Sequence, residues 1–142
     1  MSDKYFSRRN IDFTLYEALN ITELAQFPYF NAHDKDTLSM VLDASADIAE
    51  NLMRPHFADA DRHQPELVDG HVKVHPGIHE YIKTYSESGF MSAPFSNEWG
   101  GMQLPKTVAA AVEFIMGSAN NSFIMYCDLT KGAANLIIKF GI

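Results

Sequence analysis

Apolar residues recur at helical spacing along most of this chain, and this periodicity restricts it to a helical fold. The clearest stripe is formed by Leu38, Val41, Leu42, Ser45, Ile48, Ala49 and Leu52. Such a stripe is the buried face of an amphipathic helix, which should reach at least Met53. No segment alternates convincingly at strand period. We therefore expect an all-α orthogonal bundle of about five or six helices, with no sheet larger than a two-stranded ribbon.

Proline and glycine mark the expected ends of the central helices. Pro55 should break or kink the first of them, and the polar residues 58–70 read as a loop with a turn near Asp69-Gly70. Pro76 suits the first turn of the next helix, and Gly89 suits its C-terminal cap. That helix carries one apolar face, made by Ile78, Tyr81, Ile82 and Tyr85.

The two ends of the chain also have helical patterns. Asp12 can cap a short helix that carries Phe13, Tyr16 and Leu19, and Thr22 can open another turn before Phe27-Pro28. From Pro105 the sequence is apolar on most faces, which predicts a helix buried between neighbours, and a final helix is expected over about Tyr126 to Phe140. We therefore divide the chain into an N-terminal helical arm, residues 1–30, and a helical domain, residues 31–142.

The stretch EWGGMQLP, Glu98 to Pro105, concentrates special residues between two expected helices. Paired glycines allow backbone conformations that other residues avoid, and they allow another segment or a ligand to approach closely. This stretch therefore predicts a shaped loop, with a structural turn as the simpler reading and a functional role as the alternative.

Composition excludes several classes of protein. The 142 residues fit one domain, and 18 acidic against 11 basic residues give a formal charge of −7, so no nucleic-acid partner is expected. No apolar run approaches the roughly 20 residues needed to span a membrane. The single cysteine, Cys127, cannot form an internal disulfide and lies in an apolar context that suits a packed thiol. We therefore expect a cytoplasmic location.

Polar clusters offer little support for catalysis or metal binding within this chain. His71, His75 and His79 recur every four residues, but Pro76-Gly77 interrupts any helix that would align them, so loop polarity is favoured over a metal site. The acids Asp34, Asp36, Asp59 and Asp61 are most simply helix-end and solvent-facing charges. Neither a nucleophile elbow nor a glycine-rich phosphate loop is present. We assign no catalytic residue and no metal ligand.

The shaped loop and the segments after it resemble a known family. EWGGMQLP, then VAAAVEFIMGSAN, then SFIMYCDLTKGAANLIIKFG, are similar in order and spacing to the N-terminal helical domain of acyl-CoA dehydrogenases, where a YGG-x-GL-like loop leads into two helices. Upstream, YFSRRNIDFTLYEAL and DGHVKVHPGIHEYIKTYSESGF resemble the longer bacterial branch that includes methylthiopropanoyl-CoA dehydrogenase-like enzymes. The sequence departs from the common pattern at Trp99, Gln103 and Phe114.

The resemblance implies FAD-dependent α,β-dehydrogenation of an acyl-CoA thioester. In the family a carboxylate removes the α-proton while FAD accepts the β-hydrogen as hydride, and the middle β-domain and C-terminal helical domain supply the main flavin contacts and that carboxylate. Neither domain is expected within these 142 residues, so the chain should not catalyse alone and should expose apolar surface where other domains would pack. The implied partners are an acyl-CoA, an electron-transfer flavoprotein as acceptor, and further copies of the full-length protein.

The resemblance also implies a pocket-lining segment in SFIMYCDLTKG. It assigns Ile124, Met125, Asp128, Leu129 and Gly132 to the wall of the acyl channel. For each side chain the alternative is simple core packing. Asp128 is the most informative, because an acid in an apolar channel is costly unless it is hydrogen-bonded or protonated, and it would favour short or polar-tailed acyl groups.

A different class of function stays open from the sequence. The chain can also be read as a free-standing helical module that binds a partner helix or an apolar ligand and has no chemistry. Such a module would have a complete polar exterior, whereas a domain of a larger enzyme would not.

Overall fold

The structure is a computed structural model that describes residues 5–141, so Met1–Lys4 of the expected arm and Ile142 lie outside it. The α-helices are α1 (Arg8–Asp12), α2 (Lys35–Ile48), α3 (Phe57–Arg62), α4 (Pro76–Glu87) and α5 (Lys106–Phe140), and the strands are β1 (Glu66–Val68) and β2 (His71–Lys73). The two strands form an antiparallel ribbon. The predicted all-α fold, with no larger sheet, is confirmed for these residues.

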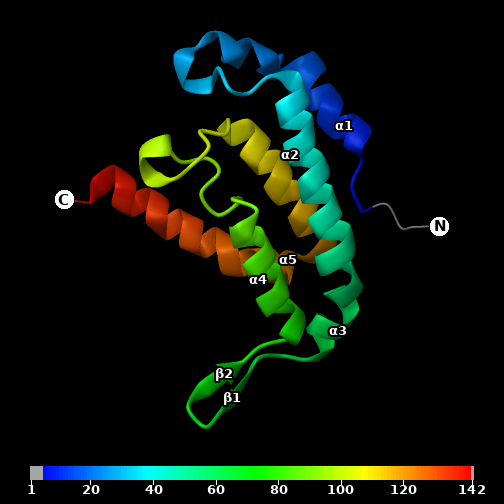
Figure 1. The fold of residues 1–142 in the computed structure, drawn as a ribbon. Helices are drawn as coiled ribbons and strands as arrows, with labels where there is room; N and C mark the ends of the chain where they lie inside the picture. Colours follow the sequence, from blue (N-terminus) through cyan, green and yellow to red (C-terminus); the bar gives the residue numbers. More distant parts are fainter. Residues whose placement is uncertain (1–4, 142) are drawn as a thin grey trace.

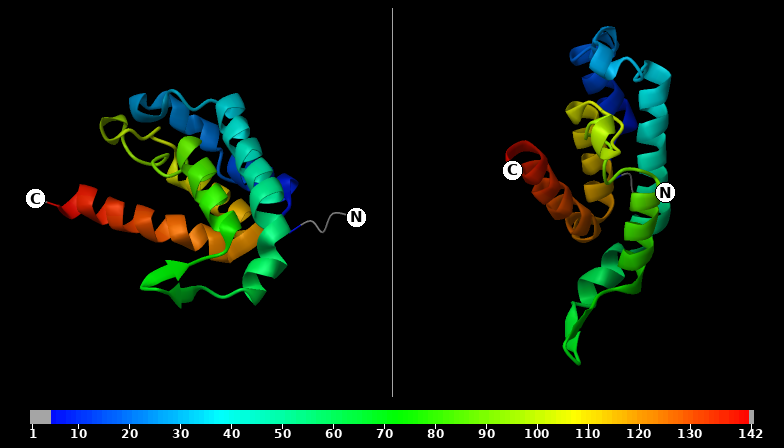
Figure 2. Two further views of the ribbon diagram at one scale, coloured as in Figure 1. Left: turned by 60° about the horizontal axis from the view of Figure 1, so that its bottom comes forward. Right: turned by 60° about the vertical axis from the view of Figure 1, so that its left-hand side comes forward.

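The bundle is built around α2, α4 and the two arms of a kinked α5 (Figure 1). The largest fully buried side chains include Leu38, Leu42, Met53, Tyr81, Tyr85, Ile115, Met116 and Phe123. They come from the apolar stripes that the sequence displays, so the core forms where those stripes meet. The β1–β2 hairpin projects away from the helices (Figure 2).

Helix α5 is two helices joined at a kink. Asn120 has φ −161° and ψ 95°, which is extended backbone inside an otherwise helical run. Its side-chain Oδ1 accepts a hydrogen bond from the Phe123 N–H (3.3 Å), so Asn120 caps the second half of the helix. The sequence analysis placed the start of the final helix near Tyr126, which is several residues too late. The polar Asn120-Asn121 pair marks the true start of this helix, and the prediction did not use it.

The N-terminal arm begins earlier than expected. Ser7, not Asp12, caps α1 by accepting a hydrogen bond from the Asn10 N–H, and Asp12 instead pairs with Arg8. The helical run continues as a π-helix over Phe13–Ala18. This wider turn moves the buried face to Ile11 and Leu15, whereas Phe13 and Leu19 of the predicted face are about half exposed, at 49% and 55%. Short 3₁₀ turns, Ile21–Gln26 and Pro28–Phe30, complete the arm.

The region around Pro55 is more regular than predicted. Helix α2 continues as a π turn, Ala49–Met53, and so reaches the predicted end at Met53. Pro55 then lies in a 3₁₀ turn, Arg54–His56, that leads directly into α3. Residues 58–62 are therefore helical, and the prediction of a loop was wrong there, since short polar helices lack an apolar stripe. The predicted turn at Asp69-Gly70 is confirmed, because both residues have positive φ, 50° and 77°.

Asp34 caps α2, and this contact predicts a pH-dependent stability. Its Oδ1 accepts a hydrogen bond from the Thr37 N–H (2.8 Å), and hydrogen bonding to Thr37 lowers the pKa of Asp34. A carboxyl with a lowered pKa stabilises the fold above its unfolded pKa of about 3.9, and this stabilisation is lost as pH falls through the folded value. Asn keeps the cap but carries no charge. The melting temperature of the wild type should therefore exceed that of Asp34→Asn at about pH 7, and this difference in melting temperature should vanish near pH 2. Thermal melts by circular dichroism measure it, and an equal difference at both pH values would contradict it.

The loop predicted from EWGGMQLP folds back on the chain just before it. Backbone N–H groups of Met102 and Leu104 both donate to the Ala93 carbonyl (3.2 and 2.9 Å), and that of Gln103 donates to the Phe95 carbonyl (2.9 Å). The buried His33 donates from Nε2 to the Met102 carbonyl (2.7 Å), which ties the loop to the segment before α2. The loop is therefore a fixed element, and it carries Phe95 towards α5.

Candidate functional site

A cleft of about 310 Å³ lies between the two halves of α5 and the loop before it. Its walls are Lys106, Ala109, Ala110 and Glu113 from the first half, Asp128, Lys131, Gly132 and Asn135 from the second half, and Pro94 and Phe95 from the loop. The kink at Asn120 brings these segments face to face, because a straight helix of this length would separate them. An added Cβ at Gly132 would meet no atom within 4 Å, so this position opens onto free space.

Lys131 connects the segments that surround the cleft. Its Nζ donates hydrogen bonds to Tyr85 Oη (2.8 Å) and Glu113 Oε1 (2.7 Å), and it lies 2.7 Å from Asp128 Oδ1. These partners come from α4, from the first half of α5 and from the second half. The Lys131 side chain is only 10% exposed, so its ammonium group makes these two hydrogen bonds and the ion pair with Asp128 inside the protein.

In this cluster the charge of the buried Lys131 is stabilised by its hydrogen-bonding and ion-pair partners. Burial lowers the pKa of Lys131, but hydrogen bonds to Asp128, Glu113 and Tyr85 outweigh it and leave the pKa raised. Burial raises the pKa of Tyr85 to about 12, although Lys131 acts in the opposite direction. Lys131 is therefore charged and Tyr85 neutral at physiological pH.

The structure brings two of the five sequence-predicted pocket residues to the cleft. Asp128 and Gly132 line it, while Ile124 is 1% exposed and packs in the core. Met125 and Leu129 lie on the outer face of α5, exposed by 39% and 73%. Helical spacing explains why Asp128 shares a face with Gly132, and Met125 with Leu129, since positions four apart share a face. Ile124 lies four positions before Asp128 but is covered by the core. The role of all five in substrate binding stays a prediction.

Asp128 is paired, which removes the electrostatic cost that the sequence argument considered. Its ion pair with Lys131 connects positions three apart on one helix face. Sequence analysis missed Lys131, Glu113 and Phe95 as lining residues. The one available signal was a lysine at that spacing from an acid within an apolar helix. Nothing local pointed to Glu113 or Phe95, because the kink and the folded loop bring them to the cleft.

A second cavity of about 240 Å³ lies on the other side of Lys131 and Phe95. These two residues line both cavities. The remaining walls of the second cavity are Met91, Ser92, Trp99, Thr130, Ala134 and Ile138.

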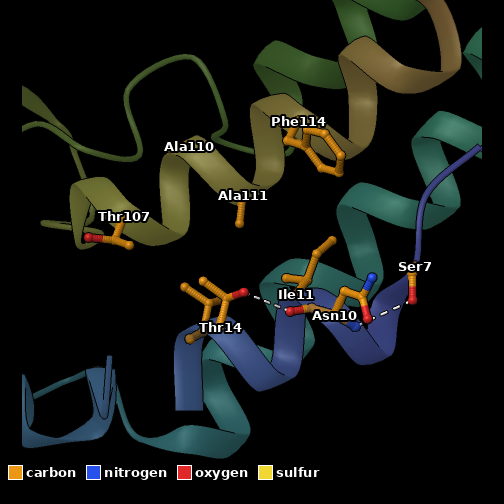
Figure 3. A pocket seen from close by; sticks show the side chains of 9 residues that line it. Ser7, Asn10, Ile11, Thr14, Thr107, Ala110, Ala111 and Phe114 are labelled. Atoms are coloured by element: carbon orange, nitrogen blue, oxygen red, sulfur yellow. Dashed lines mark hydrogen bonds between the residues drawn. The ribbon is translucent and has the colours of Figure 1, made fainter. Parts of the chain in front are cut away.

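A third hollow, of about 410 Å³, lies between the N-terminal arm and the first half of α5 (Figure 3). Its floor is apolar, with Ile11 and Ala111 facing each other, and Phe114 at one end is 58% exposed. The Thr14 hydroxyl donates a hydrogen bond to the Asn10 carbonyl (2.9 Å), so its donor is used within the arm. Among residues 5–141, no charged side chain lines this groove, in contrast to the cleft at Lys131.

Of the three histidines in the predicted pattern, His75 makes structural contacts. His75 Nδ1 accepts a hydrogen bond from the Gly77 N–H (3.1 Å) and caps α4, while its Nε2 donates to Asp59 Oδ2 (2.9 Å). This hydrogen bond is the main reason why the pKa of Asp59 is lowered. Among residues 5–141, no three His, Cys, Asp or Glu side chains converge as metal ligands.

The fold and cleft define a helical domain that encloses a small, partly polar cleft. The family model described as acyl-CoA dehydrogenase, N-terminal domain, matches residues 35–142. The chain therefore belongs to the acyl-CoA dehydrogenase family. It is 29% identical over 123 residues to 3-methylmercaptopropionyl-CoA dehydrogenase of Ruegeria pomeroyi (strain ATCC 700808 / DSM 15171 / DSS-3), an alignment that covers 82% of this chain. The chain spans about a fifth, 21%, of the length of that relative. No helix in the described part of the chain has the length and apolarity to cross a bilayer.

Proposed function

We propose that this chain is the N-terminal helical part of an enzyme that dehydrogenates an acyl-CoA thioester at its α,β bond. Family membership supports the reaction class. The single structural observation that carries the proposal is the cleft between the two halves of α5, whose lining combines small and apolar residues with charged side chains. A pocket of this size takes a short acyl group.

The acyl group is proposed to lie along the wall made by Asp128 and Gly132. Gly132 leaves room for a chain to pass, and the small residues Ala109 and Ala110 face it across the cleft. The polar end, at Glu113 and Asp128, is half-closed: these side chains are 40% and 21% exposed. An acyl tail that reaches this end meets carboxylate oxygens, which disfavours a long alkyl chain because its burial would strip water from these charges.

The residues of this chain do not fit FAD. The cleft of about 310 Å³ is at the lower end of the range for drug-sized ligands, and a flavin dinucleotide is larger than those. The sequence also lacks a glycine-rich phosphate-binding loop. We therefore propose that the flavin is bound mainly by other regions of the full-length protein.

The outer face of α5 is proposed to pack against those other regions. Leu129, Leu136, Ile137 and Phe140 are exposed by 73%, 58%, 69% and 70%. Together with the half-exposed Met125, they make an apolar strip along the second half of the helix, and such a strip marks an interaction surface. A free-standing module would leave it in water at a cost in solubility.

Flavin retention and activity test this proposal. The full-length protein should purify yellow, with flavin absorbance at about one equivalent per chain, and should reduce an artificial electron acceptor when an acyl-CoA is added. The 142-residue chain should purify colourless, because its cleft does not fit the cofactor. A full-length protein that binds flavin but reduces no acceptor with any straight-chain, branched or thioether acyl-CoA would contradict the reaction. Stoichiometric flavin on the 142-residue chain would contradict the division of roles.

A further inference from the structure

Two residues separate the cleft from the second cavity. Lys131 and Phe95 are the only residues that line both the 310 Å³ cleft and the 240 Å³ cavity, within the residues that the structure describes. The two cavities are therefore neighbours that meet at Lys131 and Phe95.

We propose that Lys131, with Phe95, is the end wall that limits the length of acyl group this enzyme accepts. The inference rests on the proposed function, since it assigns a length limit to the same cleft. Gly132 shapes the side of the cleft, whereas Lys131, which contacts Glu113 and Asp128, closes its polar end. Without the wall the two cavities would join, and an acyl chain would extend from the cleft towards Trp99 and Ile138.

The wall is rigid and does not behave as a flap. Lys131 is held from three sides, by Tyr85, Glu113 and Asp128, with N···O distances of 2.7–2.8 Å. Moving it into the second cavity would break these bonds and leave two carboxylates without their cation, which is costly in a partly buried site. A substrate methylene group offers too little binding energy to displace such a side chain, because each changes kcat/KM by only about 10- to 200-fold.

Phe95 is held by the backbone of its loop. Its carbonyl accepts the Gln103 N–H (2.9 Å), and its own N–H donates to the Ser92 carbonyl (2.9 Å). The two halves of the wall are thus fixed independently, one by side-chain bonds and one by backbone bonds. Each can be removed by substitution while the other remains.

The space beyond the wall suits an alkyl chain. Met91, Trp99, Ala134 and Ile138 supply half of its lining residues, and Trp99 and Ile138 are 61% and 38% exposed. Apolar walls of this kind accept methylene groups without a polar penalty. Opening the wall should therefore favour long chains and affect short chains little.

Chain-length selectivity of the full-length protein tests the wall. The measured quantity is the ratio of kcat/KM for octanoyl-CoA over butanoyl-CoA. In Lys131→Ala and, separately, in Phe95→Ala, this ratio should rise tenfold or more, at roughly tenfold per well-buried methylene group as the lower limit. Lys131→Met is the matched control: it removes the charge and keeps the length of the side chain, so its ratio should stay within about threefold of wild type.

The outcomes separate this inference from the proposed function. If wild type turns over neither acyl-CoA nor any branched or thioether analogue, the proposed function and the end wall are both contradicted. If wild type is active but the ratio is unchanged in folded Lys131→Ala and Phe95→Ala, only the wall is overturned. If Lys131→Met raises the ratio as much as Lys131→Ala, charge sets the limit and the wall is again overturned. Should Lys131→Ala fail to fold because Asp128 and Glu113 repel each other, Phe95→Ala decides alone.

Discussion

Replacement of Gly101 by alanine should lower the free energy of unfolding by more than about 3 kcal/mol. A Cβ at this position would overlap the backbone carbonyl of Phe95 and would lie 2.7 Å from that of Ser92. Neither carbonyl can move freely, because the loop between them is held by its own backbone hydrogen bonds. The expected result is a chain with a strongly reduced melting temperature, or one that does not fold.

Gly100 is the matched control for this steric effect. It has φ +70°, and an added Cβ would meet no atom within 4 Å. Gly100→Ala therefore adds only the strain of a left-handed backbone, about 1–2 kcal/mol. Urea denaturation of both variants gives the comparison. Equal losses would show that the loop adapts to the methyl group and that the close approach at Gly101 is unimportant.

Replacement of Asn120 by alanine should cost about 2–4 kcal/mol of stability. The Asn120 side chain is 2% exposed and makes two contacts, one from Nδ2 to the Met53 carbonyl and one from the Phe123 N–H to Oδ1, both of 3.3 Å. Alanine makes neither, and it is the best helix former, so it favours a straight α5 over the kinked one. The loss is expected from the side chain, because alanine readily adopts the extended backbone of this residue.

Asn121 supplies the control for the kink. It is the same residue type, one position later and exposed, so Asn121→Ala should change stability by less than about 0.5 kcal/mol. Denaturant midpoints for the two variants measure the difference. A loss at Asn120 no larger than that at Asn121 would mean that packing of the two helix halves, and not the asparagine, holds the kink.

The kink also connects these stability predictions to the binding site. Glu113 and Asp128 meet at Lys131 only because α5 turns at Asn120, and Phe95 reaches the same place only because its loop folds back at Gly101. Variants that leave the fold intact but shift either element should therefore alter the shape of the cleft.

The sequence by itself determined the local elements. The stripe from Leu38 to Leu52, the proline at the start of α4 and the positive φ of Gly89 after it follow from helical periodicity and backbone sterics, and the structure has all three. The family could also be identified from the sequence, because the loop and the two helical segments after it keep a recognisable order. The family match confirms this identification. These properties depend on residues close together in the chain.

Only the tertiary structure decided which residues share a cleft. Lys131 lies 18 positions from Glu113 and 46 from Tyr85, and no periodic pattern links positions so far apart. Asp128 and Leu129 look equally suited to an acyl channel in the sequence, but a rotation of 100° per residue places these adjacent positions on different faces of α5. The direction of each face was set by where α5 kinks and what packs against it, and these are properties of the whole bundle.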